Sequence, residues 1–387
     1  MNKIFIEDCC EILDSMRVPI TASKREIGEY PYYGANGIQD YVADYIFDDE
    51  LVLLAEDGGN FGSKERPIAY RVSGKCWVNN HAHVLKPKVG LDIDYLCYSL
   101  MFYKVDGLIN GATRKKLTQA AMRKMQIPFR SIKEQIHIVN ELNRIIKIKE
   151  KRQEELKLLD NLIKARFVEM FGDPVANEMG WDTLPLENAC KAIVDCPHST
   201  PSYTKEDTGF RCIRTSIVKK NRILWDEIEY IPEDEYVKRI QRKKPDVGDI
   251  VYTREGAILG IAAIIDRNCN VALGQRSMLL SPNIDKCASE FLCVAMNSDS
   301  FLDNALKGIS GSASPHINVG DIKAFRMIMP PIELQNQFVD FVHQVDKSKF
   351  VGRFPELSLF YRLFSPLYSE MICIFPYFCP YAESARE

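Results

Sequence analysis

The pattern of apolar and polar positions along the chain predicts a mixed fold that occurs twice. Short apolar or alternating runs bounded by Gly, Asp and Pro predict β-strands at residues 51–55, 78–85, 250–253, 261–265 and 278–280. Helical stretches follow at residues 93–102 and 289–306. Each is succeeded by a Gly/Ser loop, a short helix and an apolar strand ending in proline, at residues 125–128 and 325–330. The pattern therefore predicts two similar α+β globules.

A long helix is predicted between the two globules, from about residue 132 to residue 171, because this stretch contains neither proline nor glycine. Gly172-Asp-Pro174 would end it. Apolar residues recur at alternating steps of four and three, with polar residues in the middle of the series. The apolar members of this seam are Ile138, Leu142, Ile145, Leu156, Leu159, Ile163 and Met170. Such spacing is typical of a coiled coil, so the helix is expected to need a partner helix.

An internal repeat explains why the pattern occurs twice. Residues 107–148 align with residues 307–348 at a constant shift of 200, which places Gly111 on Gly311 and Gln135 on Gln335. Upstream the shift changes by only a few residues. There, residues 51–58 match residues 249–256, and residues 80–87 match residues 275–282. The order and spacing of these matches indicate duplication of one module.

Composition adds limits to this picture. The chain has 387 residues, of which 46% are hydrophobic, so each of two halves can bury a core. The formal net charge of −3 gives no overall basic signature. Twelve cysteines without a C-x-x-C pair, together with no leader-like segment in residues 1–20, favour buried free thiols in a reducing cytoplasm. No apolar run approaches the roughly 18 residues that span a bilayer.

Basic residues cluster locally despite the acidic total, in loops next to predicted strands. Arg114-Lys115-Lys116 follows the Gly111 loop and is expected to open a short helix, where backbone N–H groups would add phosphate binding. In the repeat this triplet falls on Ser314-Pro315-His316, so the frame is kept while the side chains change. The candidate DNA-contacting residues are Lys64, Arg66, His81, Arg114, Lys115, Lys116, His198, Lys219, Lys220, Arg222, Arg242, Lys243, Lys244, Gln275, Arg276, Ser314 and His316. For any single cluster, a merely solvated surface is the alternative.

Catalytic and metal-binding patterns are missing from the sequence. There is no phosphate-binding G-x-x-x-x-G-K-[ST] loop, no G-x-G-x-x-G turn, no Asn/Asp-Pro-Pro-aromatic element and no H-E-x-x-H pair. His81 and His83 would share one face of a strand, but no third ligand lies nearby in sequence, so packing or DNA contact is favoured. His198 lies in a proline-bounded loop without a paired base. We therefore predict no catalytic residue and no metal ligand.

Several short motifs, taken in order, resemble one family. They are residues 30–37 (YPYYGANG), the loop Glu56-Asp57-Gly58, Ile127-Pro128 followed by Glu134-Gln135, residues 166–174 (RFVEMFGDP), residues 195–201 (DCPHSTP) and residues 330–335 (PPIELQ). Over about residues 1–350 the sequence is similar to the specificity subunits of type I restriction–modification systems. The resemblance implies a non-catalytic, cytoplasmic DNA-binding protein in which two target-recognition domains each read half of a bipartite site.

The resemblance also implies the domains and the partners. We expect a first target-recognition domain at residues 1–131, a central coiled-coil spacer helix at 132–172, a second target-recognition domain at 173–331 and the start of a distal spacer helix at 332–350. The helices would pair and dock modification subunits, two in number, and restriction subunits would join them. S-adenosylmethionine, ATP and Mg²⁺ would belong to those partners, and this chain would hold no cofactor.

The end of the chain departs from the family pattern. Residues 351–387 are rich in aromatic residues, contain prolines at 355, 366, 376 and 380, and show no heptad. We expect this tail to follow a frame change or a recombination junction, with the second spacer helix truncated and the seam of the first left without its intramolecular partner. The alternatives kept open are a truncated or inactive variant, an enzyme that methylates or cuts DNA through an unrecognised site, and a pure interaction protein.

Overall fold

The computed structural model describes residues 2–63, 65–111, 114–307 and 315–351. The chain divides into two compact units between Arg152 and Gln153, within one long helix. The tail from residue 352 onward, on which the expected frame change falls, lies outside the described residues. Over the ranges that are described, no helix is both long enough and apolar enough to cross a membrane.

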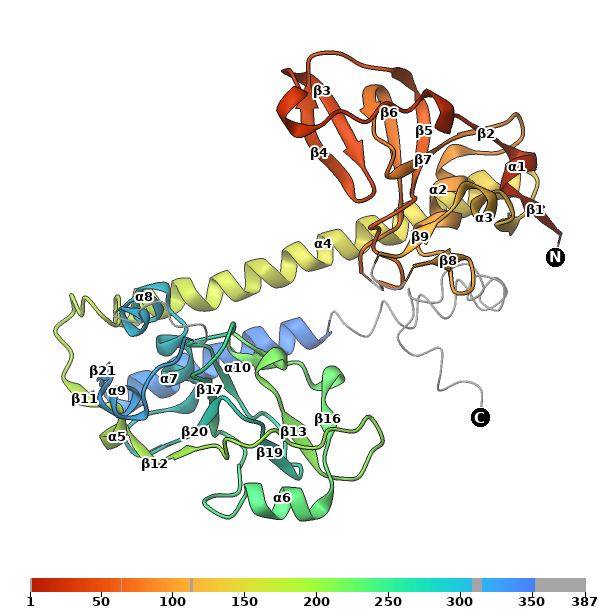
Figure 1. The fold of residues 1–387 in the computed structure, drawn as a ribbon. Helices are drawn as coiled ribbons and strands as arrows, with labels where there is room; N and C mark the ends of the chain where they lie inside the picture. The colour runs from red at the N-terminus through yellow and green to blue at the C-terminus, as the bar shows by residue number, and fades with distance from the viewer. Residues whose placement is uncertain (1, 64, 112–113, 308–314, 352–387) are drawn as a thin grey trace. The chain divides into compact units, whose positions relative to one another are not determined.

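Unit 1 is built on a six-stranded sheet (Figure 1). In order across the sheet its strands are β2 (Cys10–Ile12), β7 (Ala82–Pro87), β5 (Phe47–Ala55), β6 (Ala69–Val78), β3 (Ile27–Gly34) and β4 (Gly37–Val42). Neighbours are antiparallel except β6 and β3, which are parallel. The central strand β5 buries Val52 and Leu54 in one apolar cluster and Leu51 and Leu53 in another. Burial on both faces explains its unbroken apolar run.

Shorter elements complete unit 1. Its helices are α1 (Ile6–Cys9), η1 (Asp14–Met16), η2 (Ala22–Lys24), α2 (Ile93–Met101) and α3 (Gln119–Arg123). Two antiparallel strand pairs join β1 (Lys3–Phe5) to β10 (Gln126–Pro128) and β8 (Ile109–Asn110) to β9 (Lys116–Leu117). Helix α2 begins at a cap in which the side chain of Asp92 accepts a hydrogen bond from the N–H of Tyr95. Its residues Leu96 and Leu100 complete the cluster around Val52 and Leu54.

Unit 2 repeats this plan with smaller sheets. One sheet has the order β12 (Cys190–Asp195), β20 (Ser277–Pro282), β17 (Ile250–Thr253), β18 (Ala262–Ile264), and a second has the order β16 (Glu229–Tyr230), β13 (Arg211–Ile213), β19 (Val271–Leu273). Two strand pairs join β11 (Thr183–Pro185) to β21 (Arg326–Ile328) and β14 (Val218–Lys219) to β15 (Arg222–Ile223). The helices are α5 (Leu186–Ala189), η3 (Thr215–Ile217), η4 (Trp225–Glu227), α6 (Glu233–Arg239), α7 (Ser289–Met296), α8 (Asp299–Leu306) and α9 (Val319–Ala324).

The long helix α4 runs from Ile132 to Phe171 as predicted, and Gly172 follows it with a φ of +74°. Its two ends belong to different cores. In unit 1, Ile138 and Leu142 pack on Tyr95 of α2. In unit 2, Ile163 and Phe167 lie in the main apolar cluster. The helix is thus anchored at each end by the unit to which that end belongs.

The seam of α4 does have an intramolecular partner in unit 2, contrary to the prediction. Helix α10 (Ile332–Val351) packs antiparallel to the last part of α4, since Phe338 lies 5.5 Å from the ring of Phe167 while Lys349 lies 2.8 Å from Asp160. The predicted seam residue Ile163 is buried in this packing, and Leu159 and Met170 pack against the same core. Phe167 and Phe171 fill the core, whereas Arg166 stands over the ring of Phe341. The predicted seam left out the two phenylalanines because their side chains lie beside the heptad positions.

Two aligned glutamines fix the helices to their units in the same way. Gln135 and Gln335 are fully buried. The Gln135 side-chain amide donates to the carbonyls of Gly90 and Arg130 and accepts from the N–H of Asp92. Gln335 makes the three corresponding bonds, donating to the carbonyls of Lys286 and Pro330 and accepting from the N–H of Ala288. The shift of 200 found in the sequence is therefore a structural equivalence.

Two predicted elements are interrupted in the structure. The strand expected at residues 78–85 is the end of β6, a turn at residues 79–81 and the start of β7. The helix expected at residues 289–306 breaks after Met296, and Ser298 caps α8 by accepting from the N–H of Phe301. Short polar residues that bond to the local backbone end both elements.

The cysteines in the described part of the chain carry free thiols, which are buried except for that of Cys269. Burial raises the pKa of Cys76 and of Cys97 to about 12, so both thiols are protonated at neutral pH. These side chains act as small apolar groups in the cores.

Candidate nucleic-acid interface

One loop follows the central strand of each unit, and the two loops have the same backbone contacts. Loop 56–58 (Glu56-Asp-Gly58) follows β5, and loop 254–256 (Arg254-Glu-Gly256) follows β17. Asp57 forms a β-bridge with Lys116, and Glu255 forms one with His316. The N–H of Leu117 donates to the carbonyl of Glu56 at 2.7 Å, and the N–H of Ile317 donates to the carbonyl of Arg254 at 2.8 Å. The two loops are thus equivalent places in the duplicated frame.

Three of the candidate DNA-contacting residues meet at loop 56–58. Nη2 of Arg114 donates to Oδ1 of Asp57 at 2.7 Å. Nδ1 of His81 lies 2.6 Å from the same oxygen, without hydrogen-bond geometry. Nζ of Lys116 lies 3.0 Å from Oε1 of Glu56. Basic side chains that are far apart in sequence are therefore gathered around two neighbouring carboxylates.

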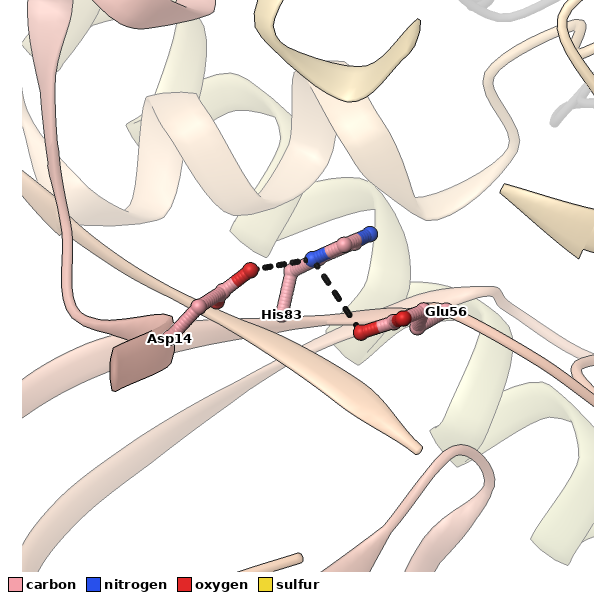
Figure 2. Close-up of side chains that lie close together, drawn as sticks. All are labelled: Asp14, Glu56 and His83. Carbon is pink, nitrogen blue, oxygen red and sulfur yellow. Dashed lines mark hydrogen bonds and ion pairs between the residues drawn. The ribbon is translucent and has the colours of Figure 1, made fainter. Parts of the chain in front are cut away.

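A buried charge network lies next to loop 56–58 (Figure 2). Nδ1 of His83, on β7, lies 2.6 Å from Oδ2 of Asp14 and 3.6 Å from Oε2 of Glu56. Nε2 of the same ring lies 2.9 Å from the carbonyl oxygen of Leu117. A carbonyl only accepts, so Nε2 carries a proton. The ring therefore connects β9, at the end of the basic loop, to η1, which holds Asp14.

The carboxylates of the network are ionised. Burial raises the pKa of Asp14, but hydrogen bonds from His83, from Gln119 and from the N–H of Val84 outweigh it and hold that pKa below its usual range. Burial likewise raises the pKa of Glu56, and the side chains of Arg17 and Lys116 overcome this effect, with a net lowering.

The sequence did not predict that Asp14, Glu56 and His83 lie close together. Ligand atoms of Asp14, Glu56 and His83 lie within 4.8 Å of one another, a spacing that suits a metal ion. However, Nη1 of Arg17 donates to Oε2 of Glu56 at 2.6 Å, and its Nη2 lies 3.4 Å from Oδ2 of Asp14. One guanidinium thus contacts both carboxylates, and the arrangement is an ion-pair network. His81, which was expected to share a strand face with His83, lies instead in the preceding turn.

In unit 2 the charges around the corresponding loop are reversed. Position 254 carries Arg where position 56 carries Glu, and Arg254 donates to both carboxylate oxygens of Asp195, from Nε at 2.9 Å and from Nη2 at 3.2 Å. Two further candidates lie at Asp195, because Nε2 of His198 is 3.2 Å from its carboxylate and Nη1 of Arg242 donates to its carbonyl. Arg276 lies at Glu255, with Nε 4.0 Å from the carboxylate.

The remaining candidates are more dispersed. Lys243 pairs with Asp246 and Asp249, and Lys220 pairs with Asp299, so these lysines take part in local ion pairs. Arg66, Lys115, Arg222 and Lys244 are exposed, Lys219 donates to the carbonyl of Ser216, and Gln275 is half-buried. Lys64 and Ser314 lie outside the described residues.

One expectation about the basic loop is wrong. Arg114–Lys116 does not open a helix, because Lys116 is in β9 and α3 starts only at Gln119, capped by the side chain of Thr118. A phosphate at this loop would therefore meet side chains and not a helix N-terminus.

Comparison with known proteins decides the family. The model of the type I restriction modification DNA specificity domain matches residues 1–158 and again residues 180–350. The chain belongs to this family. The two matches also confirm that the module is duplicated and that its resemblance to specificity subunits is real.

Relatives of the specificity-domain family span nearly the whole chain. It is 28% identical to the Haemophilus influenzae type I restriction enzyme specificity subunit S.HindORF215P, over 88% of this chain and 86% of that protein. It is 21% identical to the MjaVIII specificity subunit of Methanocaldococcus jannaschii, over 88% of this chain and 85% of that protein. The crystal structure of a type I restriction–modification S subunit from M. genitalium has the same fold, with a TM-score of 0.53, 13% identity and coverage of 97% and 95%.

Sequence reasoning missed the buried charge network next to loop 56–58. Asp14 and Arg17 lie 69 and 39 residues from the groups that they contact, so no local pattern reveals them. A signal did exist for the loops themselves. The alignment of residues 51–58 with residues 249–256 places Glu56 on Arg254, and a charge reversal at a buried position of a repeat implies a reversed partner.

Proposed function

We propose that this chain is the DNA-recognising subunit of a type I restriction–modification complex, in which unit 1 reads one half of a bipartite target and unit 2 reads the other. The observation that carries the proposal is the duplicated loop frame. The β-bridges Asp57–Lys116 and Glu255–His316 occupy equivalent positions in the two units, while their side chains differ. Two readers of different half-sites need such a constant frame with variable contacts.

The electrostatics support DNA as the ligand in spite of the net charge. Arg114, Lys115 and Lys116 are exposed near loop 56–58 of unit 1, and Arg276 and His316 are exposed at the equivalent loop of unit 2. Cationic side chains on loops can contact phosphates and base edges in a groove. Binding is therefore expected to weaken with salt, with a slope set by the number of phosphates contacted.

Under this proposal the chemistry belongs to partner proteins. Modification subunits, two in number, would dock on the spacer helices and methylate adenine with S-adenosylmethionine, and restriction subunits using ATP and Mg²⁺ would join them in the cytoplasm. Exposed apolar side chains on α4, including Leu158 and Leu162, supply a surface for such docking. This chain would bind no cofactor itself and perform no catalysis.

The decisive experiment is methylome mapping of the source cell with and without the gene. Loss of a single split adenine motif supports the proposal. An unchanged methylome contradicts the proposal. A truncated, inactive variant would give that same result. A parallel assay with the purified chain and S-adenosylmethionine tests the alternative of an unrecognised enzyme, because methylation or cleavage of DNA by the chain alone would establish catalysis.

A further inference from the structure

An arginine guanidinium lies over the glycine of each loop. A Cβ added to Gly58 would lie 3.4 Å from Nη2 of Arg114, and one added to Gly256 would lie 3.4 Å from Nη1 of Arg276. Both glycines have positive φ, +63° and +93°, where a side chain is disfavoured. The loop backbone and the preceding carboxylate therefore form one arginine seat in each unit, made by Asp57 and Gly58 in unit 1 and by Glu255 and Gly256 in unit 2.

The acid of each seat lies next to the arginine, with a hydrogen bond in unit 1 and a longer ion-pair contact in unit 2, and leaves the arginine accessible. Oδ1 of Asp57 accepts from Arg114 at 2.7 Å, and Oε1 of Glu255 lies 4.0 Å from Nε of Arg276. The two acidic side chains are 18% and 29% exposed, whereas Arg114 and Arg276 are 61% and 48% exposed. A guanidinium has five N–H donors, so one contact with the carboxylate leaves others available to a ligand.

The two arginines come from different positions of the repeat. Arg114 aligns with Ser314. Arg276 takes the place of His81, because the N–H of Glu56 donates to the carbonyl of His81 and the N–H of Arg254 donates to that of Arg276. Inheritance from the duplicated ancestor therefore does not account for both. The same seat holds an arginine supplied by a different segment in each unit.

The backbone of Arg276 adds a second sign of function. Its φ is +72°, in the left-handed region that non-glycine residues rarely adopt. Strain of this kind persists where the surrounding structure enforces it and is concentrated at functional sites. Here it directs the arginine from the turn before β20 to loop 254–256.

We propose that Arg114 and Arg276 are the guanine-reading residues of the two half-sites, and that Asp57 and Glu255 position their guanidinium groups. The inference rests on the proposed DNA-reading function. An arginine matches the O6 and N7 acceptors of guanine with two hydrogen bonds in the major groove. A carboxylate behind the guanidinium fixes the plane of that fork before DNA binds, so that less side-chain freedom is lost on binding.

The test uses the full chain and duplexes carrying the motif found by methylome mapping, with each guanine replaced in turn. Arg114→Lys and Arg276→Lys keep the charge but remove the bidentate fork. Each is expected to lower the preference for guanine at one position of one half-site by roughly 5- to 150-fold, and to leave the other half unchanged. Lys115→Ala is the matched control, since it removes a charge next to Arg114 and should weaken binding to all duplexes alike.

The positioning role has its own readout. Asp57→Asn and Glu255→Gln are expected to reduce the guanine preference of their half-site while the salt dependence of binding stays unchanged, because no phosphate contact is lost. Thermal unfolding checks that each variant folds. Arg276→Asn, which tolerates a positive φ, separates loss of the guanidinium from backbone strain.

The outcomes are distinguishable. A wild-type chain that selects no bipartite motif overturns both this inference and the proposed function. A wild-type chain that selects a motif, with arginine variants that keep their preference or lose affinity equally for every duplex, overturns the inference alone. A half-site without guanine overturns the assignment for the unit that reads it.

Discussion

Arg254 and Asp195 form a two-pronged ion pair in unit 2, and both side chains are largely buried, at 7% and 16% exposure. The pair connects loop 254–256 to the end of β12, as the pair of Arg17 and Glu56 connects loop 56–58 to the segment after β2. The polarity is opposite in the two units. Each loop is thus joined to the corresponding segment of its own unit by an ion pair, in which the loop supplies the acid in unit 1 and the base in unit 2.

Removing one member of that pair should destabilise unit 2. We predict that Arg254→Met lowers the free energy of unfolding by about 3–5 kcal/mol, because the Asp195 carboxylate is left without its main partner in a poorly hydrated place. The double variant Arg254→Met with Asp195→Leu should recover most of this loss. Urea unfolding measures both, and Arg222→Met, at an exposed position, should change stability by less than about 0.5 kcal/mol. Equal stability of the single and double variants would contradict the prediction.

The buried glutamine of each unit should matter as much as an apolar core residue. Gln335→Leu removes the partner of three buried backbone groups, so we expect a loss of about 2–4 kcal/mol in the stability of unit 2. Gln135→Leu should have the same effect on unit 1. Gln344→Ala, at an exposed position of α10, is the control. Chemical denaturation measures the stability of each variant, and no loss in Gln335→Leu would mean that water replaces the amide.

Acid should unfold unit 1 through its buried carboxylates. The pKa values of Asp14 and Glu56 are lower in the folded protein than in the unfolded chain, where they are about 3.9 and 4.3. Their contribution to stability is therefore complete above about pH 5 and is lost as the pH falls through the lower folded values.

A single substitution isolates this acid sensitivity. Asp14→Asn should lower the stability of unit 1 by about 3 kcal/mol at pH 7, because His83 loses its charged partner, and should flatten the acid limb of the curve. Thermal unfolding between pH 3 and pH 7 (the range about the two values above) provides the measurement. Asp106→Asn, at an exposed position, should reproduce the wild-type curve. A parallel acid limb in Asp14→Asn would place the titrating group elsewhere.

The exposed apolar face of α4 should serve assembly and not folding. Leu158 and Leu162 are 61% and 48% exposed and lie one turn apart. Replacing both by Glu should leave the unfolding temperature nearly unchanged and weaken binding of the modification subunit by more than about 30-fold, which corresponds to a hot spot of about 2 kcal/mol. Light scattering of the mixed subunits measures the complex. Asn161→Glu adds a charge to the same helix and should have little effect if the apolar contacts decide binding.

The sequence predicted the order of the main helices and strands along the chain because the signals for them were local and occurred in both copies. Helix α4 was predicted to the residue by its lack of proline and glycine and by Gly172, and β17 by an apolar run ending at Thr253. The strand at residues 78–85 was wrong because three polar residues between two apolar runs form a turn. The partner of the α4 seam was also missed, since it depends on which side chains of α10 face Phe167.

The candidate site was predicted in part for the same reason. Alignment of the two copies placed Lys116 on His316, and in the structure the two residues form equivalent β-bridges, one in each unit. The contacts that fix their surroundings join residues 39 to 69 positions apart, as between Arg17 and Glu56 or Asp14 and His83. Such contacts depend on strand order, which a single sequence does not encode in any short pattern.

The arginine seats have a consequence for how such proteins diverge. A seat that accepts a guanidinium from either of two neighbouring segments can lose one donor and acquire another by single substitutions, while the backbone stays as it was. Descendants of one module can then share a chemical preference without sharing the residue that produces it. A position-by-position alignment of the two halves would score the two arginines as unrelated, so a preference shared by the two units is better traced through the seat than through its occupant.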